Sequence, residues 1–111
     1  MKVTNLTSPR NGAKVAKQYN IEHNGVDYFQ SYNTIVARYK PWYLEVNDKY
    51  KYSKTTALYF RQWLKRYGLN DNEIDRLKGK LHSSDLNRQF DFILDNSNVI
   101  EVFYHKEEYN L

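Results

Sequence analysis

The sequence predicts an α+β fold: a small antiparallel β-sheet of three or four strands packed by one amphipathic helix, with a C-terminal helical segment and a final strand. Two observations predict it, a period-two alternation through the first half of the chain and one helix with a complete start, apolar stripe and stop. Strands followed by helices are typical of this class. The 111 residues fit one domain, with a β-meander and helix over residues 13–67 and an acidic C-terminal extension over residues 68–111.

The first half predicts an antiparallel meander. The stretch NLTSPRNG is rich in turn residues, so we expect the ordered fold to begin near Ala13. AKVAKQYNIEH then alternates, and the following Asn24-Gly25 pair is a strong hairpin signal because both residues tolerate positive φ. VDYFQSY is the returning strand, and TIVARY either continues it or forms a third. Pro41 interrupts the pairing, and WYLEVND is one more short strand.

YSKTTALYFRQWLKRYGL predicts the main helix. Ser53 is a suitable N-cap, and Gly68 suits the left-handed residue that ends a helix. Apolar residues recur at helical spacing and predict a stripe packed on the sheet: Ala57, Phe60, Trp63, Leu64 and Tyr67.

Residues 70–81 predict a shorter helix, with Asn70 and Glu73 in capping-box spacing. The segment SSDLNRQFDFILDNSN fits two patterns, a helix capped by Ser84 or a strand with Phe90, Phe92 and Leu94 on one side. The preceding cap favours the helix. VIEVFYH predicts the final strand, and KEEYNL a solvated tail.

Composition excludes several classes of protein. The chain is 41% hydrophobic and 27% charged, as in globular proteins, and its lack of cysteine excludes disulfides and thiolate chemistry. We find no apolar run of about 18 residues and no secretion signal, so we expect a cytoplasmic protein with no membrane partner. The three histidines lie on separate predicted elements, and the four glycines form no phosphate-binding loop. We therefore expect no catalytic residues, no metal, no cofactor and no enzymatic activity.

Charge is divided unequally along the chain. Residues 1–67 hold 12 Lys or Arg against 4 Asp or Glu, a net +8, and residues 68–111 hold 5 against 9, a net −4. Between Arg38 and Arg66 the cations alternate with aromatic residues, a composition that suits phosphates and unpaired bases. The alternative is a solvated helix face above a core that uses most of the aromatics. Three of these cations share the outward face of the main helix: Lys54, Arg61 and Lys65.

The strand VDYFQSY has an unusual second face. Phe29 and Ser31 point to one side, and a solvated opposite side normally carries charge and threonine rather than two tyrosines and a glutamine. We predict that this side is a platform for a partner. The predicted partner-binding residues are therefore Lys54, Arg61, Lys65, Tyr28, Gln30 and Tyr32.

Residues 1–67 contain three blocks of a recognisable pattern: NGAKVAKQYNIEH, YFQSYNTIVA and YKYSKTTALYFRQWL. Together these blocks resemble a family of small uncharacterised proteins carried by phages and mobile elements of Gram-positive bacteria. The chain departs from the family pattern at Lys17, where the family has asparagine, and at Tyr50-Lys51, where it has Trp-Asp. The residues that match are Asn11, Gly12, Lys14, Val15, Ala16, Gln18, Tyr19 and Ile21, then Phe29, Gln30, Ser31, Tyr32, Ile35 and Ala37, and then Tyr52, Ser53, Thr55, Thr56, Trp63 and Leu64.

The resemblance implies a phage accessory protein and no particular reaction. We expect a non-catalytic inhibitor of a bacterial defence system: an anti-CRISPR protein that binds a CRISPR effector nuclease in the host cytoplasm and blocks its nucleic-acid binding or cleavage. The acidic residues from Asp71 to Asp95 and Glu107–Glu108 would imitate phosphates there. The alternative is a phage nucleic-acid-binding or regulatory module that holds DNA or RNA with the basic-aromatic segment of residues 38–66.

Overall fold

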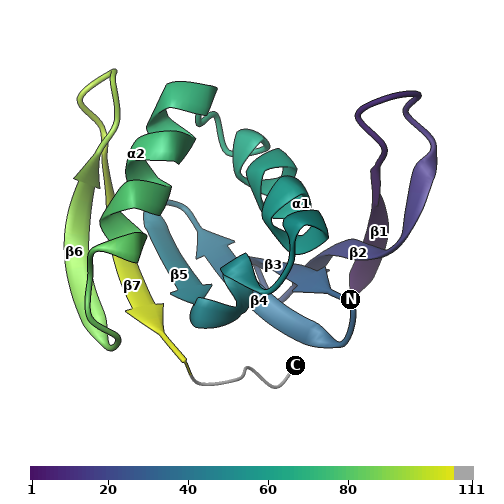
Figure 1. Ribbon diagram of the computed structural model, residues 1–111, viewed down its shortest axis with the longest axis horizontal. Helices are drawn as coiled ribbons and strands as arrows, with labels where there is room; N and C mark the ends of the chain where they lie inside the picture. Colours follow the sequence, from purple (N-terminus) through teal and green to yellow (C-terminus); the bar gives the residue numbers. More distant parts are fainter. Residues whose placement is uncertain (107–111) are drawn as a thin grey trace.

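The computed structural model describes residues 1–106 and contains one seven-stranded sheet with two helices (Figure 1). The strands lie in the order β1-β2-β3-β4-β5-β7-β6. The predicted solvated tail lies, from Glu107 onward, outside the described residues. The elements are β1 (Lys2–Thr7), β2 (Lys14–His23), β3 (Val26–Ser31), β4 (Thr34–Lys40), β5 (Tyr43–Asn47), the 3-10 helix η1 (Asp48–Lys51), α1 (Lys54–Lys65), α2 (Asp71–His82), β6 (Arg88–Ile93) and β7 (Val99–His105).

The fold is α+β, but the expected sheet of three or four antiparallel strands under one helix is wrong. The sheet has seven strands and is mixed, because β5 and β7 pair in parallel. A parallel pair needs a long crossover, and the segment that holds α1 and α2 supplies it. Both helices lie on the same face of the sheet (Figure 1). Since β7 and β6 continue the sheet beyond β5, the C-terminal half extends the sheet that the N-terminal half begins.

The expected start of the ordered fold near Ala13 is also wrong. Residues 2–7 form β1, which pairs antiparallel with β2 and buries Leu6 in the core. The turn chemistry is confined to residues 8–13, where the Ser8 amide donates to the Ala13 carbonyl at 2.8 Å. The short strand was hidden because its stability depends on β2, a partner that the segment itself does not reveal.

The preference for a helix over residues 84–95 is wrong as well, because residues 88–93 form β6. Phe92 stands opposite Ile100 in an antiparallel pair with β7, and its ring is buried under α2. The Ser84 hydroxyl donates to the Lys80 carbonyl at the end of α2 and does not cap a new helix. The strand alternative, which the positions of Phe90 and Phe92 indicated, is the correct one.

The local start and stop signals are confirmed. The Ser53 hydroxyl accepts from the Thr56 amide at the start of α1, and Gly68 has a φ of 87° just beyond its end. Asn24 and Gly25 both have positive φ in the β2–β3 turn. A final strand, β7, also forms where it was expected.

The core lies between the helices and the sheet. Trp63 of α1 is fully buried and stacks near Phe29 and Phe60, with ring centroids 6.0 Å and 6.4 Å away. Its indole N–H donates to Oδ1 of Asn20 at 2.8 Å. The α2 stripe packs on the other half of the same face and includes Ile74, Leu77 and Leu81. Neither helix in residues 1–106 has the length and hydrophobicity needed to span a membrane.

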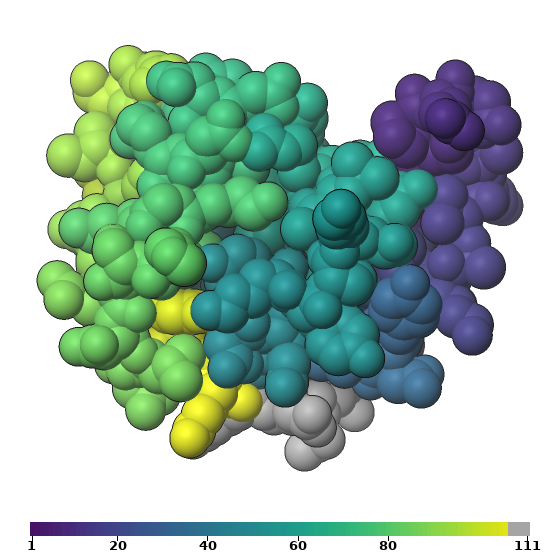
Figure 2. Space-filling model, viewed as in Figure 1, coloured from purple at the N-terminus to yellow at the C-terminus, as the bar shows by residue number. Residues whose placement is uncertain are grey.

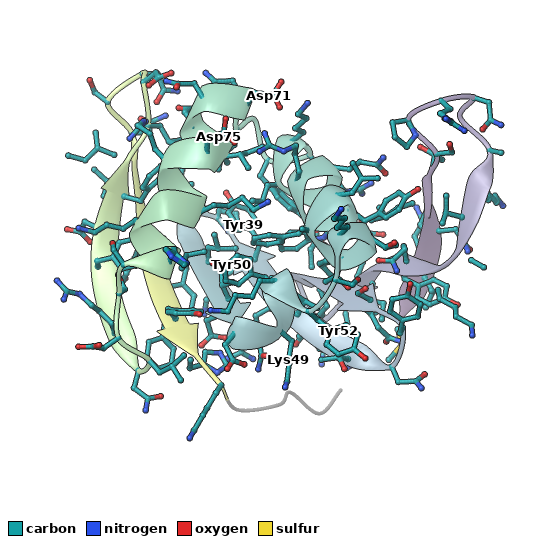
Figure 3. The ribbon with its side chains drawn as sticks, viewed as in Figure 1. Tyr39, Lys49, Tyr50, Tyr52, Asp71 and Asp75 are labelled. Carbon is teal, nitrogen blue, oxygen red and sulfur yellow. The ribbon has the colours of Figure 1, made fainter. Side chains whose placement is uncertain are left out.

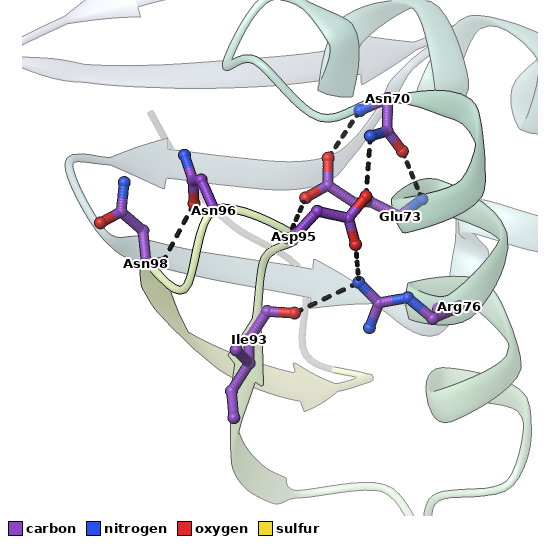
Figure 4. Close-up of polar contacts among 7 residues, drawn as sticks. All are labelled: Asn70, Glu73, Arg76, Ile93, Asp95, Asn96 and Asn98. Carbon is purple, nitrogen blue, oxygen red and sulfur yellow. Dashed lines mark hydrogen bonds and ion pairs between the residues drawn. The ribbon is translucent and has the colours of Figure 1, made fainter.

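One buried carboxylate ties α2 to the β6–β7 hairpin (Figure 4). Glu73 accepts from the Asn70 amide at 2.9 Å, which completes the predicted capping box, and from the Asp95 amide at 2.7 Å. Around it, Asn70 donates to the Asp95 carboxylate at 3.0 Å, and Arg76 donates to the same carboxylate and to the Ile93 carbonyl. The hairpin is thereby held against the first turn of α2.

Candidate ligand-binding cleft

A cleft with a volume of about 570 Å³ opens where the β3–β4 turn, η1 and the start of α1 meet. Small-molecule sites commonly have volumes of roughly 300–1,000 Å³. Lys49 and Tyr52 lie at its border, at the lower edge of the view in Figure 3. We call this feature the α1 cleft. It is lined by Ser31, Tyr32, Asn33, Thr34, Val36, Lys49, Tyr52, Ser53 and Thr56.

Hydroxyl groups form one wall of the α1 cleft. The Ser31 and Thr56 hydroxyls are hydrogen-bonded at 2.8 Å, and the Ser53 hydroxyl lies 3.1 Å from that of Thr56. Behind this wall, Gln18 is the cross-strand partner of Ser31 and is fully buried. Neither its amide nitrogen nor its amide oxygen has a hydrogen-bond partner among the described residues. Buried amides are normally satisfied, so Gln18 is an unpaired group that lies next to this wall without lining the cleft.

The start of α1 is electrostatically suited to an anion. A helix N-terminus carries partial positive charge and free amides, and it normally attracts Asp or Glu. The first turn of α2 follows this rule with Asp71 and Glu73, whereas the first turn of α1 contains no acidic residue and begins with Lys54. With Lys49 on the cleft wall, the positive potential there is not compensated by a carboxylate lining the cleft.

Two tyrosines flank the α1 cleft and remain accessible. Tyr52 is 74% exposed and Tyr32 is 40% exposed. Tyr32 has a φ of 56°, and its carbonyl and amide are held by hydrogen bonds from the Gln30 side chain at 2.8 Å and to the Lys17 carbonyl at 2.7 Å. The ring of Tyr32 is therefore presented from a defined turn rather than from a free loop.

The structure separates the predicted tyrosine platform. Tyr28 does lie on the sheet face away from the helices, but it is buried there in a small cluster with Ile21 and Ile35. Gln30 is partly buried and bonds to the Tyr32 backbone. Of the three predicted sheet residues, only Tyr32 lines the α1 cleft.

The predicted basic face of α1 is paired with acids of α2. Arg61 contacts Asp71 and Asp75, and Lys65 contacts Asp71 at 2.9 Å. Figure 3 labels the two aspartates near the upper end of α2. The hydrogen bond to Asp75 raises the pKa of Arg61, and hydrogen bonds from Lys65 and Arg61 lower the pKa of Asp71. Reversing Arg61 and Lys65 to acids would therefore disturb the α1–α2 contact. Lys54, at the first position of α1, has no ion pair within residues 1–106.

The aromatic residues of the basic segment divide between core and surface. Tyr50 and Tyr59 are buried, and burial raises the pKa of Tyr50 to about 12. Tyr39 stacks on Tyr67 with ring centroids 4.1 Å apart. Tyr52 and Trp42 remain exposed. The core therefore uses part of the predicted aromatic surface, and Tyr52 of the exposed part lines the α1 cleft together with Lys49.

Four of the predicted phosphate-mimicking acids are also engaged inside the fold, whereas Asp85 and Asp91 are exposed. Asp71 and Asp75 pair with Arg61, Asp95 pairs with Arg76, and Glu73 is buried in its capping box. Glu107–Glu108 lie outside the described residues. An acidic surface that imitates a nucleic acid is thus weaker than the charge count of the C-terminal half indicated.

Sequence reasoning missed most of the residues that line the α1 cleft, including Ser31, Thr34, Lys49 and Thr56. One local signal was available, since YSKTT places a lysine and no acid after a helix cap. The other lining residues come from the β3–β4 turn and η1, whose approach to α1 is a tertiary contact. Within residues 1–106, no three His, Asp or Glu side chains are grouped as a metal site would require.

Comparison with known proteins adds a family without an activity. One family model matches the chain over residues 1–79, and it is described as a family of unknown function. The matched region contains β1 to β5, η1, α1 and most of α2, and therefore every residue that lines the α1 cleft. No curated protein matches the chain. No solved structure matches it either.

Proposed function

Because this chain belongs to the family of unknown function DUF8033, which supplies no activity, we propose its function from the α1 cleft: a non-catalytic protein that binds single-stranded nucleic acid. The single observation that carries the proposal is that one cleft joins exposed tyrosines, an exposed lysine and a helix start without an acid. The helix start would receive a phosphate, and Tyr32 and Tyr52 would stack on unpaired bases.

Binding is a better reading of the α1 cleft than catalysis. A serine or threonine nucleophile needs a base within hydrogen-bond reach. The lining residues include no histidine, aspartate or glutamate, and the Ser31 and Thr56 hydroxyls bond to each other. Ser53 donates to Thr56, and one proton of the Ser31–Thr56 pair is used between them, so one of the three hydroxyl protons remains to donate to a bound anion.

A single strand fits the α1 cleft better than a duplex. Every unpaired base has a face that can stack on an aromatic ring, whereas paired bases in a duplex are stacked already. Tyr52 and Tyr32 come from different elements on the border of one cleft, so a flexible strand can adapt to both. Stacking is tolerant of sequence, and we expect little preference among bases.

Removing the tyrosine rings is expected to weaken binding without unfolding the protein. Base–aromatic stacking contributes about 1–3 kcal/mol per base, so Tyr52→Ala and Tyr32→Ala should each reduce affinity for a labelled single-stranded oligonucleotide about 5- to 150-fold. Fluorescence anisotropy at several salt concentrations measures this, and affinity must fall steeply as salt rises. Trp42→Ala is the matched control, because Trp42 is 52% exposed and does not line the cleft. Equal loss in the control, or no binding by the unaltered protein at low salt, contradicts the proposal.

The defence-inhibitor hypothesis becomes a wider proposal that uses the same cleft. Since the acids of α2 are paired within the fold, an inhibitor would act by holding the guide or target strand rather than by imitating it. The place of action would be the cytoplasm of the host bacterium. We expect the gene to raise plaque numbers on a host with an active CRISPR system and the Tyr52→Ala form to raise them less. No rescue against any CRISPR type contradicts the inhibitor role and leaves the binding proposal standing.

A further inference from the structure

The first two strands form a projecting arm that the sequence did not predict. We call residues 7–17 the β1–β2 arm; they comprise the end of β1, the turn and the start of β2. Figure 2 shows this arm, in purple, standing apart from the body of the molecule, with a hollow between its outer end and α1. Apart from Ser8 and Val15, all residues of the arm are exposed. An exposed two-stranded ribbon is an element that can reach along a partner.

The arm is held at its base and ordered at its tip. Leu6 is buried in the core just before the arm, and Gln62 of α1 bonds to both the amide and the carbonyl of Thr7, at 3.1 Å and 2.6 Å. At the tip, the Arg10 amide donates to the Ser8 hydroxyl, and the Ala13 amide donates to the Asn11 side chain. The conformation of the arm is therefore largely set before any partner binds, which lowers the entropic cost of binding.

The arm is uniformly basic. Residues 1–18 contain four cations and no Asp or Glu. Lys2 pairs with Glu22 near the base of the arm, whereas Arg10, Lys14 and Lys17 are exposed and make no ion pair within residues 1–106. The cations on the outer face of α1 behave differently, since Arg61 and Lys65 are both paired with α2. The arm is thus a positive surface that the described part of the fold does not neutralise.

The base of the arm joins the α1 cleft. The carbonyl of Lys17 accepts the Tyr32 amide at 2.7 Å, and Gln18 stands opposite Ser31 in the β2–β3 pairing. Lys17 itself has a φ of 66°, at an irregular stretch of the β1–β2 pairing. The last cation of the arm is therefore next in space to one of the two tyrosines that flank the cleft.

We infer that the β1–β2 arm is a second contact surface for the same single strand, in which Arg10, Lys14 and Lys17 hold the phosphates of nucleotides that extend beyond the α1 cleft. This inference rests on the proposed function. Charge complementarity favours a nucleic acid as the partner, because a polyanion binds more tightly when several spaced cations contact its phosphates. The exposed uncharged side chains of the arm are small or polar, such as Pro9, Ala13 and Ala16, so the arm has no large apolar anchor for a membrane or a protein core.

The test compares two oligonucleotides and two triple variants. The oligonucleotides have about 4 and about 15 nucleotides, the range of lengths that one small binding fold covers. The arm variant is R10Q/K14Q/K17Q, and the matched control K40Q/R88Q/K106Q removes the same charge from exposed positions outside the arm and the cleft lining. Circular dichroism and thermal melting should show that both variants fold like the unaltered protein.

We expect the arm variant to lose about 10- to 100-fold in affinity for the longer oligonucleotide and to keep its affinity for the shorter one. For this variant the slope of log affinity against log salt concentration should become shallower by about 2, because each of the three lost phosphate contacts with a single strand contributes about 0.7 to the slope. The control should change both quantities much less. If arm and control variants lose equally, the effect is one of net charge and the arm inference is wrong.

The outcomes also separate this inference from the proposed function. If both oligonucleotides bind and the arm variant retains the affinity for the longer one, only the arm inference fails. If Tyr52→Ala has no effect while the arm variant weakens binding, the arm is a contact surface and the cleft is not the site. If neither oligonucleotide binds the unaltered protein at low salt, both proposals fail.

Discussion

Trp63→Ala is expected to lower the free energy of unfolding by about 3–5 kcal/mol, the usual cost of truncating a fully buried large aromatic residue. The indole is 0% exposed and contacts the rings of Phe29 and Phe60, and Tyr67 lies edge-on at 4.9 Å. Its removal also takes away the N–H that donates to Oδ1 of Asn20. Small domains have stabilities of only about 5–15 kcal/mol, so this variant should be near the limit of folding.

Urea denaturation followed by circular dichroism measures this effect. Trp63→Phe is the graded comparison, because it keeps most of the apolar ring and loses only the hydrogen bond and part of the volume. Trp42→Ala is the control for exposure, since Trp42 is a surface residue and surface changes usually alter stability by less than about 0.5 kcal/mol. If Trp63→Ala cost less than about 1 kcal/mol, Trp63 would not be packed as the structure places it.

Glu73→Ala is expected to cost about 2–4 kcal/mol, a large effect for a charged residue. The side chain is 4% exposed, and its two oxygens accept from the Asn70 and Asp95 amides at 2.9 Å and 2.7 Å. Alanine would leave both amides without their acceptor, and a buried unsatisfied donor costs about 1–3 kcal/mol. The loss of stability should therefore have two parts: one from the start of α2, and one from the contact that holds the β6–β7 hairpin to α2.

Two companion variants show whether the hydrogen bonds are the cause. Glu73→Gln keeps the size of the side chain but turns an NH₂ group toward one of the amides. Its free energy of unfolding should therefore lie between those of the unaltered protein and Glu73→Ala. Asp75→Ala changes an acid on the exposed side of the same helix, where ion pairs contribute about 0–1 kcal/mol. Hydrogen exchange at the Asp95 amide is the direct measurement. Unchanged protection of that amide in Glu73→Ala would contradict the role assigned to Glu73.

Local signals in the sequence determined the start of both helices, the end of α1 and the first hairpin. Ser53 caps α1, Asn70 and Glu73 form a capping box, and Asn24-Gly25 makes a turn with positive φ. These features depend on a few neighbouring residues, whose backbone preferences and hydrogen bonds act over one or two turns of chain. The burial of Trp63 also followed from the sequence, because Trp63 lies on the apolar stripe of α1, which is the face expected to pack on the sheet.

The site followed from the sequence only in part. Tyr32 and Lys54 were predicted and lie at or beside the α1 cleft, whereas Ser31, Lys49 and Thr56 were not among the candidates. Ser31 lies at the end of β3, Lys49 in η1 and Thr56 in α1. No residue pattern in the sequence indicates that these three elements meet at one cleft. The predicted role of each candidate remains a prediction until binding is measured.

Only the tertiary structure decided the extent of the sheet and the fate of several charged and aromatic residues. The strand β1 exists because β2 lies beside it, and β6 exists because β7 lies beside it. β7 inserts between β5 and β6, so β5 and β6 are not adjacent although they follow each other among the strands of the chain. A strand satisfies its backbone hydrogen bonds with another segment, so its stability cannot be judged from its own residues. The same holds for Arg61, whose charge is met by two aspartates of α2, and for Tyr28, whose exposure depends on neighbours from two other strands.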